Sequence, residues 1–168
     1  MRSPAGKLGG LLGALLGAVL LLAVAGFVGY QYFRTAMPRA GLAPGDAEVV
    51  ALGEALYAKH CASCHGSSLQ GQPNWQQRLA NGRLPPPPHD ASGHTWHHPD
   101  EQLFTLTKFG PAALVGGGYE SDMQAYEGVL SDDEIRAVLS YIKSTWPPEL
   151  QARHDEINRR SQAAGQSQ

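Results

Sequence analysis

The sequence predicts an all-α domain preceded by one apolar helix of membrane-spanning length. Three segments carry the apolar spacing or the end signals of amphipathic helices. No segment sustains the alternation of apolar and polar residues that a half-buried strand requires. A fourth run is apolar on every face and has no charged residue over 23 positions. We therefore expect three or more packed helices, a separate apolar helix and no sheet.

The apolar run extends from Leu8 to Tyr30. At about 1.5 Å of rise per residue, a helix of this length covers a hydrocarbon core of ~30 Å. We predict a transmembrane anchor over residues 8–30 that leaves residues 1–7 in the cytoplasm. A signal peptide cleaved after Ala25 is the alternative, although apolar residues continue past that position. Two basic residues flank the run on each side, so flanking charge does not set its orientation.

Composition divides the remaining chain into a linker, a domain and a tail. Residues 31–46 contain the prolines and glycines of a linker, residues 47–148 form the predicted domain, and residues 149–168 are a polar tail. From Ala47 onward, nine basic and fourteen acidic residues give a net charge of −5. This acidic balance argues against a polycationic nucleic-acid binder, and two cysteines exclude a four-cysteine zinc site.

Each predicted helix has a start or stop signal. Asp46 is placed to cap the first helix, and Pro99–Phe109 is a second helix that ends at Gly110. Ser131 and Glu134 form a capping box at the start of a third. The apolar faces comprise Val49, Leu52, Gly53, Leu56 and Tyr57 in the first helix, and Ile135, Val138, Leu139, Ile142 and Trp146 in the third.

Two other segments are a proline run and the carboxyl-terminal stretch. Pro85–Pro88 predicts an extended polyproline loop on the surface. Glu149–Arg160 has the composition of a further polar helix with little to bury, and residues 161–168 are expected to fray.

Both cysteines lie in one pentapeptide, Cys61-Ala62-Ser63-Cys64-His65. The spacing C-x-x-C-H is the attachment signature of c-type haem. Two thiols on one turn can add to the two vinyl groups of a porphyrin, and the adjacent histidine then ligates the iron. A thioredoxin-like redox pair would need a βαβ context that is missing here, and half of a zinc site is the other alternative. The motif predicts one covalent haem c held by Cys61, Cys64 and His65.

A wider pattern surrounds the pentapeptide. Gly53, Tyr57 and Cys61 follow one another at intervals of four residues. Further on, Met123-Gln124-Ala125-Tyr126 precedes the capping box. Together these segments resemble the class I cytochrome c family over roughly Ala47 to Trp146.

That resemblance implies a class I cytochrome c fold, with helices around a covalently bound haem. It also implies that Gly53 and Tyr57 pack against an aromatic residue of the last helix, here Tyr141. The family more often has proline after the ligand methionine, where this chain has Gln124.

Met123 is the predicted sixth ligand of the iron. It is the only methionine after the linker, and it lies in a polar stretch that follows three glycines. A methionine that merely filled the core would lie in an apolar stripe instead. A thioether ligand would stabilise ferrous iron and raise the reduction potential.

Four histidines lie within ten residues and are alternative candidates for the sixth ligand: His89, His94, His97 and His98. One of them could replace Met123 and give a haem of lower potential. The cluster could also bind a second metal such as copper, or line the haem pocket with the Trp96 indole donating to a propionate. A solvated, histidine-rich loop is the alternative without a function.

These predictions converge on an electron carrier and not an enzyme. Iron with both axial positions filled has no open site for oxygen or peroxide chemistry. Haem is attached to such motifs after export in the family that the chain resembles, so the domain should lie in the periplasm or outside the cell. The expected partners are the membrane and redox donor and acceptor proteins. A fixed haem subunit of a larger respiratory oxidoreductase, or a haem or copper sensor that uses the histidine cluster, remain alternatives.

Overall fold

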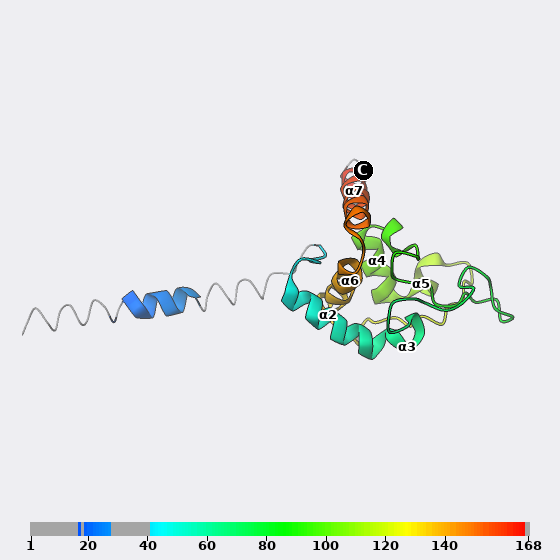
Figure 1. Cartoon of the computed structure of the whole chain (residues 1–168), viewed down its shortest axis with the longest axis horizontal. Helices are drawn as coiled ribbons and strands as arrows, with labels where there is room; N and C mark the ends of the chain where they lie inside the picture. The colour runs from blue at the N-terminus through cyan, green and yellow to red at the C-terminus, as the bar shows by residue number, and fades with distance from the viewer. Residues whose placement is uncertain (1–16, 18, 28–40, 167–168) are drawn as a thin grey trace, which may run out of the picture. The chain divides into compact units, whose positions relative to one another are not determined.

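The computed structural model describes residues 17, 19–27 and 41–166 of the 168-residue chain (Figure 1). They belong to two units, Met1–Arg39 and Ala40–Gln168, and each is described by itself. In the first unit, residues 19–27 are helical and their side chains are exposed. The rest of the predicted anchor over residues 8–30, apart from residue 17, lies outside the described residues. Within the described part of the chain, no helix is long and apolar enough to cross a membrane.

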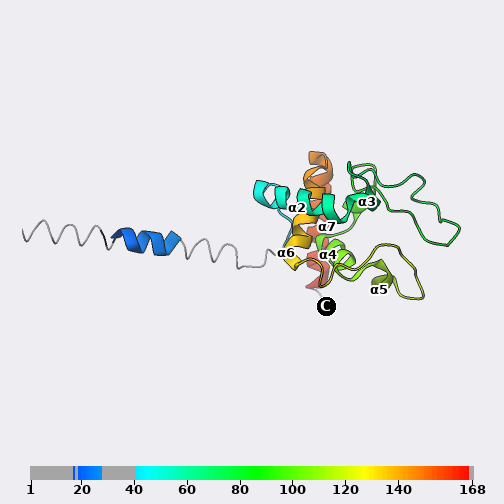
Figure 2. The same cartoon turned by 90° about the horizontal axis from the view of Figure 1, so that it is seen from below.

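The second unit is all-helical, as predicted. Its elements in chain order are α2 (Ala47–His60), α3 (Ala62–His65), the 3₁₀ helix η1 (Thr95–His97), α4 (Asp100–Phe109), α5 (Pro111–Val115), α6 (Asp132–Ser144) and α7 (Pro148–Gly165). No strand occurs among residues 41–166. Long loops join α3 to η1 and α5 to α6, and both extend away from the helices (Figures 1 and 2). The first loop carries the proline run and the second carries Met123.

The helix starts follow the local signals in the sequence. The Asp46 side chain accepts hydrogen bonds from the amides of Glu48 and Val49 at the start of α2. Ser131 and Glu134 form the predicted capping box at the start of α6. Each cap satisfies amides that the helix leaves unpaired, a contribution of about 1 kcal/mol. α4 begins at Asp100, one residue later than predicted, because Pro99 is the N-cap and not the first helical residue.

α2 and α6 lie against each other in the centre of the domain (Figures 1 and 2). A Cβ atom on Gly53 would come within 2.0 Å of the Ala137 carbonyl oxygen and 2.9 Å of the Tyr141 Cβ. Only a glycine allows the two backbones to approach this closely. The rings of Tyr57 and Tyr141 then meet at 5.5 Å between centroids. The predicted packing of Gly53 and Tyr57 against Tyr141 is confirmed.

The apolar core lies between α2, α4 and α6. Its buried members are Tyr57, Leu69, Leu103, Phe104, Tyr126, Leu130, Ile135, Val138, Leu139, Ile142 and Trp146. Trp146 was expected within the last predicted helix, but α6 ends at Ser144 and Trp146 follows it. Its indole is buried and donates from Nε1 to the carbonyl oxygen of His89 over 2.8 Å. The end of α6 is thereby fixed to the loop that follows the proline run.

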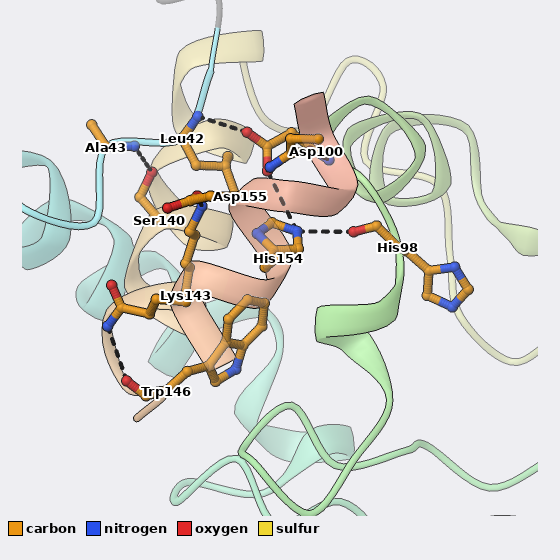
Figure 3. Close-up of polar contacts among 11 residues, drawn as sticks. Leu42, Ala43, His98, Asp100, Ser140, Lys143, Trp146, His154 and Asp155 are labelled. Atoms are coloured by element: carbon orange, nitrogen blue, oxygen red, sulfur yellow. Dashed lines mark hydrogen bonds and ion pairs between the residues drawn. The ribbon is translucent and has the colours of Figure 1, made fainter. Parts of the chain in front are cut away.

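α7 has more to bury than the sequence indicates. His154 is fully buried, and its Nε2 donates to the carbonyl oxygen of His98 over 2.9 Å (Figure 3). The Asp100 carboxylate lies 3.5 Å from the same nitrogen and accepts from Asn158 Nδ2. Helix α7 is therefore docked by a buried polar network instead of an apolar stripe. It also continues to Gly165, through residues 161–165 that were expected to fray.

Candidate functional site

The two cysteines lie on one turn at the junction of α2 and α3, Cys61 between the two helices and Cys64 within α3. Cys61 closes α2 and opens α3, and its carbonyl oxygen accepts from the amides of Cys64 at 3.1 Å and His65 at 2.9 Å. Both thiols are free, Cys61 half-buried and Cys64 exposed. This turn brings the three predicted residues together, as the motif requires.

The environment of Cys61 does not suit thiol–disulfide exchange. Burial raises the pKa of the Cys61 thiol to about 11. A nucleophilic redox thiol has a lowered pKa, produced by nearby positive charge or a helix start. Cys61 therefore lacks the activation that the nucleophilic thiol of a thioredoxin-like motif has.

His65 is held in the form that ligates a metal. Its ring is buried, and Nδ1 donates to the carbonyl oxygen of Pro87 over 2.9 Å. The proton therefore sits on Nδ1, and Nε2 keeps a free lone pair. Burial lowers the pKa of His65, only partly opposed by that hydrogen bond, so the imidazole is neutral near pH 7.

The proline run is part of this site: it is a loop without helix or strand, as predicted, but it is not at the surface throughout. Pro85 and Pro88 are buried, and Pro87 supplies the acceptor for His65. Gly71 adopts a φ of +64°, and a Cβ there would come within 2.4 Å of the Pro88 nitrogen. A Cβ on Gly93 would come within 2.1 Å of the Pro88 carbonyl oxygen. The two glycines let the chain close tightly around the prolines and fix the acceptor in place.

The next residue after the prolines, His89, covers one face of the His65 ring. The two rings are stacked, with centroids 4.0 Å apart and an interplanar angle of 26°. His89 Nδ1 forms a 2.9 Å hydrogen bond with Thr95 Oγ1. Burial, with His65 and His94 nearby, lowers the pKa of His89 well below its usual value. His89 is thus a neutral ring fixed beside the predicted ligand.

Two of the other three histidines have tryptophan rings as partners. The exposed His94 stacks on Trp75, with ring centroids 5.1 Å apart, and the exposed His97 lies against Trp96 at 3.7 Å. Trp96 Nε1 donates to the Gly93 carbonyl oxygen, so this N–H has a partner within the loop. Among the residues that the structure describes, no three His, Cys, Asp or Glu side chains are grouped to hold a metal ion. The second-metal interpretation therefore gains no support.

Met123 is half-buried in the loop between α5 and α6. Its amide donates to Ser121 Oγ over 3.1 Å. Three residues further on, the amide of Tyr126 donates to the Lys108 carbonyl oxygen over 3.0 Å, at the end of α4. The Tyr126 hydroxyl donates to the carbonyl oxygen of His60 over 2.7 Å. The segment that carries Met123 is thereby fixed to the residue immediately before Cys61.

The loop of Met123 is also attached through Glu120 and Asp122. Arg83 pairs with Glu120 at 3.1 Å and also with Asp122, the residue before Met123. Arg83 belongs to the loop between α3 and η1. The two long loops are thus joined by ion pairs, although each pair is exposed and individually weak.

The residues present fit a covalently attached haem. The donor set comprises two free thiols on one turn and a buried neutral imidazole whose Nε2 is unprotonated. When bound, the haem supplies an iron atom that cycles between Fe(II) and Fe(III). Cys61 and Cys64 would hold it through thioethers, and His65 would ligate the iron while Pro87 keeps its Nδ1 proton in place.

Comparison with known families agrees with this geometry. A family model described as cytochrome c matches residues 50–146, which is more than half of the chain. The chain belongs to the cytochrome c family. Neither the curated proteins nor the solved structures compared with it gave a match. Cys61, Cys64 and His65 in this domain imply covalent haem c, and the domain implies electron transfer by that haem.

Proposed function

We propose that this cytochrome c carries a single haem with His65 and Met123 as axial ligands and works as a one-electron carrier at the outer face of the cytoplasmic membrane. The hydrogen bond from Tyr126 to His60 carries the proposal for Met123. It fixes the loop that holds the domain's only methionine to the chain beside Cys61. The family and the C-x-x-C-H turn support one haem.

A carrier needs both axial positions filled and little else. His65 Nε2 is free for one position, and the Met123 thioether belongs to a half-buried residue of a tethered loop. Filled positions leave the iron without a site for oxygen or peroxide. Redox partners of such carriers dock weakly and briefly, which suits small interfaces.

The location is proposed from residues 8–30 and from the chemistry of haem attachment. These 23 residues have no charge and are long enough to span the membrane as a helix. Since the family attaches haem after export, the amino terminus would stay inside and the domain would lie outside. We expect the whole chain to sediment with membranes and to resist washing with high salt, because apolar attachment is not screened by salt. A soluble species whose mass begins at Gly26 would contradict the anchor.

The optical spectrum of the purified protein tests the ligands. Wild-type protein should be six-coordinate and low-spin, with the weak sulfur-to-iron charge-transfer band of the oxidised state. Met123→Ala should lose that band, shift toward high spin and bind carbon monoxide when reduced. Met37→Ala, which removes a methionine outside the domain, is the matched control and should leave the spectrum unchanged.

Two results would contradict the proposal. A low-spin spectrum that survives Met123→Ala, together with a high-spin spectrum in a variant of His94, His97 or His98, would assign the sixth position to a histidine. Purification in a fixed stoichiometry with integral membrane proteins after gentle solubilisation would indicate a subunit of a larger oxidoreductase instead of a free carrier.

A further inference from the structure

The backbone and the ring of His89 are both held by neighbouring residues, although His89 is neither of the proposed axial ligands. Its amide donates to the Leu69 carbonyl oxygen over 2.7 Å, and its own carbonyl oxygen accepts from Trp146 Nε1 over 2.8 Å. The ring has an edge contact with Tyr57, at 6.4 Å between centroids and 76° between planes. The backbone and the side chain of His89 are therefore both fixed. A residue that only filled space would not need these hydrogen bonds.

The orientation of the ring is set by a second hydrogen bond chain. Thr95 Oγ1 lies 2.9 Å from His89 Nδ1 and 3.4 Å from the Pro88 carbonyl oxygen, within hydrogen-bond distance of both. Thr95 is buried, so water does not compete for either bond. Consecutive proline carbonyl oxygens thus orient two neighbouring imidazoles, Pro87 that of His65 directly and Pro88 that of His89 through Thr95.

The stacked ring of His89 restricts the rotation that the His65 ring could otherwise make. Its hydrogen bond to Pro87 fixes one edge of the ring, but a single bond permits the ring to tilt about that edge. A flat ring packed at 4.0 Å and nearly parallel blocks the tilt on one side. Residues that orient a ligating histidine tune both its alignment and its strength as a donor to the metal.

We propose that His89 is a positioning residue for the proximal ligand: its stacked ring fixes the plane of the His65 imidazole and thereby helps to set the reduction potential of the haem. The inference depends on His65 as a haem ligand and not on Met123. A less well aligned imidazole donates less to ferric iron, so loss of the stack should raise the potential.

Three substitutions distinguish a role of His89 in positioning His65 from a role in merely filling space. His89→Leu fills the site without a flat ring, His89→Phe keeps a flat ring without polar atoms, and Thr95→Val frees the ring of His89 while nearly preserving shape. His97→Leu is the matched control, because His97 is exposed in η1 and its ring lies against Trp96, not against His65.

The readouts are the reduction potential and the g values of the oxidised haem by electron paramagnetic resonance, which report the plane of the axial imidazole. Both are measured on protein with its haem attached. His89→Leu should raise the potential and shift or broaden the g values, and Thr95→Val should do so less. His89→Phe keeps the flat ring but loses the bond to Thr95, so its g values should lie between those of wild type and His89→Leu, and His97→Leu should change nothing.

Unchanged g values and potential in His89→Leu, with haem fully attached, would overturn the proposal. If His89→Leu does not accumulate as holoprotein, Thr95→Val decides: wild-type g values and potential there would equally overturn it. A response of His89→Phe equal to that of His89→Leu would show that the flat ring is not the cause. Because Met123→Ala leaves His65 in place, a failed methionine assignment would not change these expectations.

Discussion

The hydroxyl of Tyr126 donates to the carbonyl oxygen of His60 over 2.7 Å, joining residues that are 66 positions apart. Tyr126 is three residues after Met123, and His60 immediately precedes Cys61. One buried side chain therefore couples the two halves of the haem site. The ring of Tyr126 also meets the His60 imidazole at 6.2 Å and 88°.

Tyr126→Phe tests this coupling. The change removes one net hydrogen bond, worth about 0.5–1.5 kcal/mol, and leaves the ring in place. We expect a lower free energy of unfolding by about that amount and a looser Met123 loop. Exogenous imidazole should then bind the oxidised haem several-fold more tightly, since it must displace the sixth ligand. Tyr119→Phe, in the same loop, is the control, and an equal response of both variants would contradict a specific role for Tyr126.

Gly53→Ala tests the close approach of α2 and α6. A methyl group there would meet the Ala137 carbonyl oxygen at 2.0 Å, so the helices must separate. Overpacking of this kind costs about 1–3 kcal/mol, which exceeds the gain of about 1 kcal/mol from the better helix propensity of alanine. Thermal unfolding of the holoprotein should show a clearly lower melting temperature than wild type. Gly45→Ala, where the new Cβ would have no neighbour within 4 Å, should be close to neutral.

The covalent attachment of haem is tested at each thiol in turn. Cys61→Ala and Cys64→Ala should each retain haem through one thioether, at reduced holoprotein yield, because each thiol of the turn forms its own bond to the porphyrin. The double variant should release its haem into acidified organic solvent. Ser63→Ala lies between them and should retain haem fully. Extraction of haem from wild-type protein would contradict a c-type attachment.

The parts of the fold that the sequence predicted are those with local causes. Asp46 and Ser131 cap helices through amides two and three residues away, so their roles can be inferred from short patterns. The haem turn is likewise contained within Cys61–His65. The packing of Gly53 against α6 was predicted from a family resemblance. The local sequence could not predict it, because the residues that require a glycine there lie in a distant helix.

The parts that could not be predicted depend on contacts between distant residues. The acceptor for His65 is a backbone oxygen of Pro87, and no side-chain pattern encodes a carbonyl group 22 residues away. His154 lies in a polar helix without an apolar stripe, so its burial follows only from the path that brings His98 and Asp100 to it. A histidine and a carboxylate separated by 54 positions give no periodic signal.

The buried His154 makes the stability of the domain depend on pH. Its pKa is lowered mainly by burial and further by Lys143, while Asp100, the His98 carbonyl group and Asp155 oppose the shift. Nδ1 has no hydrogen-bond partner in the described structure, so the neutral ring carries its proton on Nε2. In the unfolded chain the same imidazole takes up a proton near pH 6.5.

The sign of the dependence follows from proton uptake. Below about pH 6.5, His154 is protonated in the unfolded state. In the folded state it stays neutral until the pH falls to its lower folded-state pKa. The contribution of His154 is therefore complete above pH 6.5 and is lost as the pH falls below that value. We expect the free energy of unfolding of the holoprotein to decline between pH 7 and pH 5, and His154→Gln to show a shallower decline.

Lys143→Met supplies the sharper comparison. It removes a buried ammonium group that disfavours protonation of His154, while its partner Asp155 is half exposed and tolerates the loss. The folded-state pKa of His154 should move back toward its usual value, so this variant should also lose less stability on acidification than wild type. The change is measured by urea unfolding at a series of pH values, with fixed ionic strength. Parallel pH profiles for wild type, His154→Gln and Lys143→Met would show that His154 does not govern the acid sensitivity of the domain.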